Sequence, residues 1–138
     1  MTGQTKNRVL LSLDAAAREA VLARSERVDL AAGSVLARTG ERTSAAIFPE
    51  TAVISTLADF PDGTTVDMAN VGREACSGLN LVLGNGTQFG TDEIQIGGTA
   101  RRLPADRLPA LMEQHAGLER ALRCTVQAIV YQLMICGA

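Results

Sequence analysis

The sequence predicts a mainly β domain, arranged as a sandwich, barrel or jelly roll and flanked by helices. Short apolar or alternating runs between residues 26 and 103 are separated by turn signals roughly every 8–12 residues, which is typical of these folds. Thirteen glycines indicate many turns, and three Phe, one Tyr and no Trp leave the core to Leu, Val, Ile and Ala. The two ends of the chain show the spacing of three and four residues that is typical of helices.

The first helical region is predicted in two pieces. Residues 7–13 (NRVLLSL) form a short apolar turn, and either Ser12 or Asp14 then caps a second segment from Ala15 to Arg24. The pattern changes at Arg27–Leu30, where polar and apolar residues alternate as they do in a half-buried strand.

Further strands are predicted up to the middle of the chain. Apolar or β-branched runs occupy 34–37, 45–48 and 52–57, with turn glycines or Pro49 between them. Asp62-Gly63 is a strong hairpin signal, and it joins the run at 52–57 to a second strand at 64–68.

The middle of the chain combines a loop, a helical turn and two more strands. The loop begins at Gly72 and leads into about one helical turn at 78–83. Glu93–Ile96 then alternates cleanly, Gly97-Gly98 is predicted to be a two-residue hairpin turn, and 99–103 is its return strand.

Two helices are predicted at the end. The first covers Pro104–His115, and Pro109 implies that it either begins nearer that residue or kinks there. The second, Leu118–Cys136, is the most strongly helical segment of the chain. It carries an apolar stripe formed by Leu118, Leu122, Thr125, Val126, Ile129, Leu133 and Cys136.

Charge and cysteine usage exclude several classes of protein. The net charge is -2 and no basic stripe occurs, so we expect no DNA binding from this chain. The polar N-terminus lacks a secretory signal, and no apolar run approaches the ~20 residues that span a bilayer. Three cysteines without a CxxC pair indicate reduced thiols. We therefore expect a cytoplasmic protein that does not contact membranes.

Seven phrases, in this order and spacing, carry a resemblance that runs from about residue 7 to residue 135. They are NRVLLSL (7–13), AGSVL (32–36), IFPE (47–50), DGTTV (62–66), VGRE (71–74), GL (78–79) and ARRLPADRL (100–108). Together they resemble the sensor domain of Crp/Fnr-type bacterial transcription regulators. The resemblance implies a cyclic-nucleotide-binding-like jelly roll, a cupin-type double-stranded β-helix, over 1–116. It also implies a long C-terminal dimerisation helix at 117–138.

The residues that hold a cyclic nucleotide in this family are replaced here. In nucleotide-binding members, a Glu directly follows the Gly of the central loop and an Arg lies just after the short helix. Here Leu79 follows Gly78, and the position of the Arg falls on Gln88 or Phe89. A buried phosphate without a cationic partner costs several kcal/mol, so we expect no tight binding of cyclic AMP or cyclic GMP.

The walls of the expected pocket are apolar or neutral. They favour a small neutral or apolar effector, or a pocket filled by its own side chains. The predicted pocket residues are Val66, Met68, Gly78, Leu79, Leu81, Gln88 and Phe89.

Other chemistries of this fold need residues that the sequence lacks. Iron–sulfur members use N-terminal cysteines, whereas the first cysteine here is Cys76. His115 is the only histidine and is predicted to lie on the surface near a helix end, so haem ligation, a cupin metal site and a Ser-His-Asp triad are all unsupported. We expect no cofactor, no metal and no enzymatic activity. Cys76 lies near Arg73, which could lower its pKa, but an apolar filler role is favoured over a redox role.

The last helix predicts a homodimer, because its apolar stripe needs a second surface and the family pairs this helix as a coiled coil. In complete members, a winged helix-turn-helix follows, whereas this sequence stops at Gly137-Ala138. We therefore expect no DNA-binding domain, as in a truncated gene product or an isolated sensor domain. An alternative function is a stand-alone interaction module that forms heterodimers with full-length regulators.

Overall fold

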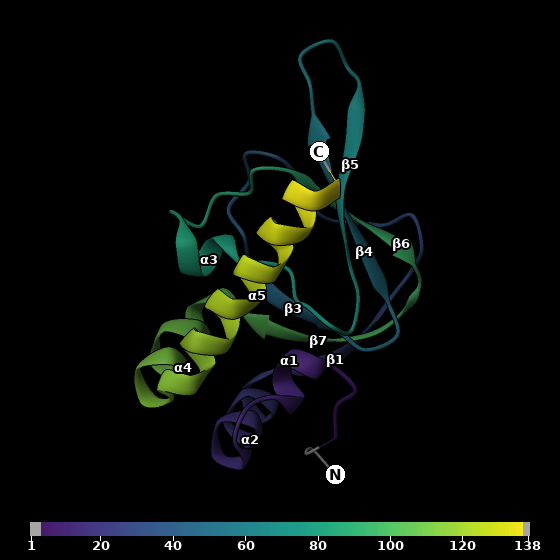
Figure 1. The fold of residues 1–138 in the computed structure, drawn as a ribbon. Helices are drawn as coiled ribbons and strands as arrows, with labels where there is room; N and C mark the ends of the chain where they lie inside the picture. Colours follow the sequence, from purple (N-terminus) through teal and green to yellow (C-terminus); the bar gives the residue numbers. More distant parts are fainter. Residues whose placement is uncertain (1–3, 137–138) are drawn as a thin grey trace.

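The computed structural model describes residues 4–136 (Figure 1). Helices α1, α2 and α4 gather at one end of the strands, and α5 crosses in front of them toward the base of the β4–β5 hairpin (Figure 1). The helices are α1 (Arg8–Leu11), α2 (Ala15–Arg24), α3 (Asn80–Leu83), α4 (Leu108–Gln114) and α5 (Ala116–Cys136), with a 3₁₀ turn η1 (Ala105–Arg107). The strands are β1 (Glu26–Leu30), β2 (Val35–Ala37), β3 (Ala45–Pro49), β4 (Val53–Asp59), β5 (Thr65–Val71), β6 (Thr91–Ile96) and β7 (Gly98–Pro104).

The strands form two antiparallel sheets, with the orders β1-β7-β3 and β2-β6-β4-β5. The predicted mainly β fold with flanking helices is thereby confirmed. The Asp62-Gly63 hairpin is also confirmed, because β4 pairs with β5 and Gly63 adopts a φ of 88°, which glycine allows without steric cost. The carboxylate of Asp62 stabilises this turn by accepting a hydrogen bond from the backbone N–H of Thr64 at 3.0 Å.

The predicted hairpin at Gly97-Gly98 is wrong. β6 pairs with β4 and β2, whereas β7 pairs with β1 and β3, so the chain passes from one sheet to the other at this point. Both glycines lie where two backbone segments approach each other closely, and they do not form a hairpin turn. A Cβ on Gly98 would lie 2.7 Å from the backbone nitrogen of Ala52, which leaves no room for any side chain at the crossing.

The N-terminal helices are held by two side-chain caps. Asp14 caps α2 by accepting a hydrogen bond from the N–H of Ala17 at 2.8 Å, which decides between the two predicted caps. Asn7 is fully buried and caps α1, while its amide donates to the carbonyl oxygens of Pro49 and Ala75 at 2.8 and 2.9 Å. Asn7 therefore ties the first helix to β3 and to the central loop.

At the C-terminal end, Pro109 decides where α4 begins. α4 starts at Leu108, and Pro109 occupies its first turn, where a missing N–H is tolerated. The first of the two predicted alternatives, a helix that begins near Pro109, is therefore the one that forms.

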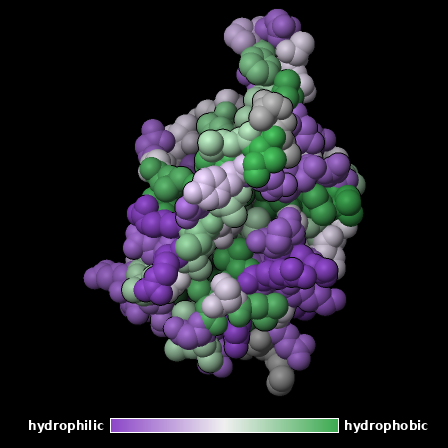
Figure 2. Space-filling model, viewed as in Figure 1, coloured by the Kyte–Doolittle hydropathy of each residue, from purple (hydrophilic) through white to green (hydrophobic). Residues whose placement is uncertain are grey.

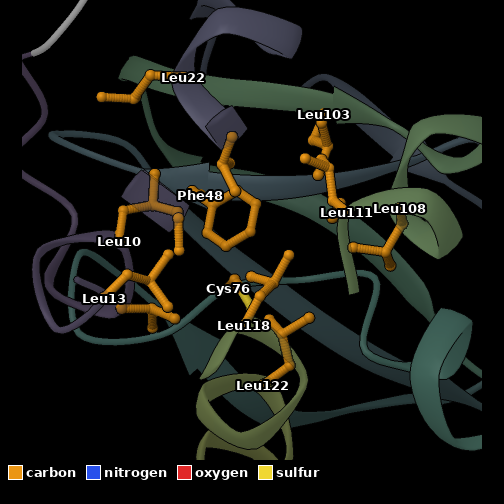
Figure 3. Packing of buried hydrophobic residues seen from close by; sticks show 14 residues of the cluster. Leu10, Leu13, Leu22, Phe48, Cys76, Leu103, Leu108, Leu111, Leu118 and Leu122 are labelled. Carbon is orange, nitrogen blue, oxygen red and sulfur yellow. The ribbon is translucent and has the colours of Figure 1, made fainter. Parts of the chain in front are cut away.

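Two apolar clusters form the core. The larger cluster joins the helices to one face of β3 and β7, with Phe48 at 0% exposure among leucines from α1, α2, α4 and α5 (Figure 3). The smaller cluster lies among strands of the two sheets and includes Ile47, Ile54 and Ile94. Both clusters are built almost entirely from aliphatic side chains, so the fold forms its core with few aromatic residues.

Candidate ligand-binding site

A cavity of about 190 Å³ lies between β4–β5, the central loop and α5. We call it the α5 cavity, since the second half of that helix forms one wall. Its lining comprises Thr56, Met68, Ala69, Val71, Cys76, Ser77, Gly78, Leu79, Asn80, Gln88, Phe89, Asp92, Val126, Ile129 and Val130. Most of this surface is apolar, and the polar groups come from the central loop, the start of α3, β4, the segment before β6, and β6 itself.

The central loop is fixed against β3 at Gly78. Ser77 and Ile47 exchange backbone hydrogen bonds of 2.9 and 3.3 Å, and Gly78 follows with a φ of 83°. A Cβ at Gly78 would lie 2.7 Å from the carbonyl oxygen of Ala45, so only glycine fits here. The loop thereby presents Leu79 to the cavity.

A chain of side-chain hydrogen bonds runs along the polar part of the site. The amide of Asn80 donates to the hydroxyl of Thr43, which donates to the Gln88 amide oxygen at 2.9 Å. The Gln88 amide nitrogen donates to the carboxylate of Asp92 at 2.8 Å, and the Thr56 hydroxyl donates to its other oxygen at 2.8 Å. We call this set the Gln88–Asp92 chain. It satisfies buried polar groups that would otherwise be costly.

Asp92 is the acidic group of the site and is 5% exposed. Burial raises the pKa of its carboxyl group, against the opposing effect of the hydrogen bonds from Thr56 and Gln88. Asp92 also lines a second cavity, of about 240 Å³, on the other side of Ser77 and Gly78. Asp92 therefore lines both cavities.

The predicted pocket residues divide into two groups. Five of the seven line the α5 cavity: Met68, Gly78, Leu79, Gln88 and Phe89. The other two do not line it. Val66 is 51% exposed on β5, where the register with β4 shifts between Ala69 and Asp67 and interrupts the alternation that would place Val66 on the same face as Met68. Leu81 packs against the larger core cluster.

Sequence reasoning missed the partners that complete the site, namely Thr43, Thr56, Asn80 and Asp92. Asp92 had a usable signal, because it lies two residues before the buried Ile94 on an alternating strand and therefore shares its inward face. The pairing of the others depends on register and on contacts between segments far apart in the chain, which no local pattern contains.

The structure also bears on Cys76. Its thiol is 1% exposed in the larger core cluster, and burial raises its pKa to about 12 (Figure 3).

We predict that a Cys124→Ser/Cys136→Ser variant, whose sole thiol is Cys76, reacts with a chromogenic disulfide only after denaturation, since the thiolate is the nucleophile. Thiol titration at pH about 8 measures this, and stoichiometric fast labelling of the native protein would restore the redox interpretation.

The described part of the apolar stripe predicted for the last helix faces the protein's own domain. Leu118 and Leu122 are 0% and 1% exposed in the larger core cluster, and Val126 and Ile129 line the α5 cavity. Thr125 is half-buried and donates its hydroxyl to the carbonyl oxygen of Ala121 at 2.8 Å. The side chains of Leu133 and Cys136 lie outside the part of the chain whose side chains the structure describes.

A different line of residues on α5 is open to solvent. Cys124, Ala128, Tyr131 and Ile135 are all exposed, the last two at 56% and 76%, and they recur at spacings of four, three and four. We call them the outer stripe. Apolar surface is visible along the outward face of α5 and around its C-terminal end (Figure 2).

Residues 4–136 carry neither a metal-binding cluster nor a membrane-spanning helix. No group of three or more His, Cys, Asp or Glu side chains there is placed to hold a metal ion, and His115, which ends α4, is half-buried. None of the helices in this range combines the length and apolar character needed to cross a membrane.

Comparison with solved structures identifies the fold. The sensor domain of the transcriptional regulator DNR from Pseudomonas aeruginosa aligns with a TM-score of 0.71 and 15% identity, covering 93% of this chain and 86% of that one. The N-terminal domain of a transcriptional regulator from Streptomyces coelicolor A3(2) gives 0.69 and 18%, covering 96% and 93%. The Thermus thermophilus catabolite activator protein gives 0.76 and 12%, covering 92% of this chain and 60% of that chain.

These similarities show a cyclic-nucleotide-binding-like fold of the kind found in the sensor domains of bacterial transcription regulators. No protein-family model and no curated protein matches the sequence.

Proposed function

From this fold and its cavity, we propose that the chain is the effector-sensing and dimerisation domain of a Crp/Fnr-type transcription regulator. The observation that carries the proposal is the shared use of α5. Val126, Ile129 and Val130 form one wall of the α5 cavity, and the outer stripe lies on the same helix. A ligand that pushes on the cavity wall therefore acts directly on the helix proposed to hold two subunits together.

The proposed coupling follows from how α5 is attached. Its first half is anchored, because Leu118 and Leu122 are buried in the larger core cluster. Beyond Leu122, the residues Val126, Ile129 and Val130 line the α5 cavity, and Ile129 also packs against the smaller core cluster. Filling that cavity would stabilise one position of the second half of α5 over others, which is how a ligand shifts a population between two arrangements.

We further propose that the effector is not a cyclic nucleotide. Gln88 stands near the place where nucleotide-binding members hold the phosphate with Arg, and its amide is hydrogen-bonded to the carboxylate of Asp92. A phosphate in the cavity would therefore meet a buried negative group and no guanidinium. Leu79 offers no acceptor to a ribose hydroxyl. Both substitutions oppose the same ligand.

Isothermal titration calorimetry of the purified protein tests this part of the proposal. We expect no saturable heat with cyclic AMP or cyclic GMP up to millimolar concentration, because the cost of burying an unpaired phosphate beside a carboxylate exceeds the gain from apolar contacts. A dissociation constant in the micromolar range or tighter for either nucleotide would overturn it.

The proposed dimer uses the outer stripe in place of the stripe predicted from the sequence. Cys124, Ala128, Tyr131 and Ile135 occupy the alternating spacing of four and three residues that brings side chains to one seam of a coiled coil. Two copies of α5 related by a two-fold axis would bury these four residues against each other, while Leu118 and Leu122 stay in the core of each domain.

A further inference from the structure

The buried carboxyl group of Asp92 is not explained by the proposed function. The carboxylate is buried, and its two oxygens accept hydrogen bonds only from neutral groups, the Thr56 hydroxyl and the Gln88 amide. Within the part of the chain that the structure describes, no Lys, Arg or His nitrogen lies within 4.0 Å of it. Buried carboxylates without a counter-ion are rare, because the charged form loses its hydration.

The hydrogen bonds around Asp92 all have the same direction. Asn80 donates to Thr43, Thr43 donates to Gln88, and Gln88 donates to Asp92, so each dipole in the Gln88–Asp92 chain points its positive end toward the carboxylate. Such an arrangement supports a negative charge at its end. A carboxylate offers about four lone-pair sites, and two donors occupy two of them, which leaves acceptor capacity on a residue that lines the α5 cavity.

A cationic side chain that lines the second cavity lies near another carboxylate. Arg102 lines the second cavity together with Asp92. Its guanidinium, however, lies 4.0 Å from the carboxylate of Glu26, and the side chain is 35% exposed. The positive charge of Arg102 is therefore drawn toward the outer edge of β1 and β7 and does not neutralise Asp92.

The rest of the α5 cavity limits the size and character of a ligand. Leu79, Val126, Ile129 and Val130 contribute aliphatic walls, and the volume is about 190 Å³. An apolar cavity of about 150 Å³ in another protein accommodates benzene, so a body of six to eight carbon atoms is the appropriate size. The polar groups are confined to one part of the wall, which fits a molecule with a single polar head.

We propose that the α5 cavity binds a small apolar amine, whose ammonium group pairs with the Asp92 carboxylate while its hydrocarbon part contacts α5. This inference rests on the proposed function only in taking the α5 cavity as the effector site. Anionic ligands are excluded by the same carboxylate, which gives the site a selectivity opposite to that of a phosphate-binding pocket.

A matched ligand series on the wild-type protein tests the proposal without any substitution. The probes are n-hexylammonium, 1-hexanol and hexanoate, which share a six-carbon chain and differ in the charge of the head. Titrations followed by amide chemical shifts in NMR give each dissociation constant. We expect hexylammonium to bind about ten- to a hundredfold more tightly than hexanol, as a charge-assisted hydrogen bond requires, and hexanoate to bind more weakly than both.

Two variants locate the effect. Asp92→Asn keeps the side-chain shape and removes the charge, so the preference for hexylammonium over hexanol should fall to about one. Glu93→Gln removes the same charge from the neighbouring residue, which points to the opposite face of β6, and should retain the full preference. Thermal melts of both variants establish that they are folded.

Equal affinity of the wild-type protein for hexylammonium and hexanol would overturn the amine proposal, as would failure of all three probes to bind at millimolar concentration. A preference that persists in Asp92→Asn would overturn it as well. These failures differ from that of the proposed function, which is contradicted by tight binding of cyclic AMP or by a monomeric chain.

Discussion

Leu122→Ala is expected to lower the free energy of unfolding by about 2–5 kcal/mol. Leu122 is 1% exposed and packs in the larger core cluster together with Cys76 and Leu118 (Figure 3). Truncation removes buried methyl groups and leaves a cavity beneath α5 that the surrounding leucines cannot fill without leaving their rotamers. Chemical denaturation at a fixed protein concentration measures the change.

The matched control is Leu83→Ala. Leu83 is the last residue of α3 and is 55% exposed, so the same substitution there should change stability by less than about 0.5 kcal/mol. Similar effects at the two positions would mean that α5 does not pack on its own domain as described.

Tyr131→Asp is expected to raise the dissociation constant of the proposed dimer by about a hundredfold or more. Tyr131 is the third residue of the outer stripe and is 56% exposed in the single chain. In a two-fold coiled coil, the substitution would place two carboxylates in an apolar seam, where both desolvation and like-charge repulsion oppose association. Sedimentation equilibrium over a range of concentrations gives the dissociation constant.

Ala110→Asp provides the comparison for the Tyr131 variant, because Ala110 is an exposed helical residue on α4, away from the outer stripe. It introduces the same charge and should leave association unchanged. If both variants associate as the wild-type chain does, the outer stripe is not the interface. Circular dichroism separates dissociation from unfolding in each case.

Much of the fold could be predicted because its signals are local. The alternation in Arg27–Leu30, the Asp62-Gly63 turn and the helical spacing after Gly117 each depend on neighbouring residues, and each corresponds to an observed element. Gly97-Gly98 was misinterpreted because a glycine pair has the same local signal in a hairpin and at a crossing between sheets. Only the partners of β6 and β7, which lie far away in the sequence, distinguish the two.

The site could be predicted in part. Counting forward from Gly78 indicated Phe89, and counting back from Ala100 indicated Gln88, as pocket positions, and both residues line the α5 cavity. The role of Gln88 could not be predicted, because its partners Thr43 and Asp92 come from different segments, and Thr43 is 45 residues away. Sequence reasoning therefore found the loss of the family's cation without finding the carboxylate that stands beside it.

The last helix shows the limit of periodicity most clearly. The spacing of Leu118, Leu122 and Ile129 identified a buried face, but a buried face can pack on its own domain or on a second subunit. In the structure, these residues pack on the core of their own domain. The exposed outer stripe has a weaker hydrophobic signal, since Cys124 and Ala128 are small. It is recognisable only because the structure shows that the face with Leu118 and Leu122 packs on the domain.

Sedimentation velocity of the full chain at tens of micromolar tests most directly whether this is a dimerising sensor domain. We predict a single species with twice the 14.5 kDa mass of the chain, converted toward monomer by Tyr131→Asp. A clean 14.5 kDa monomer for the wild-type protein at that concentration would contradict the proposal that α5 links cavity and dimer.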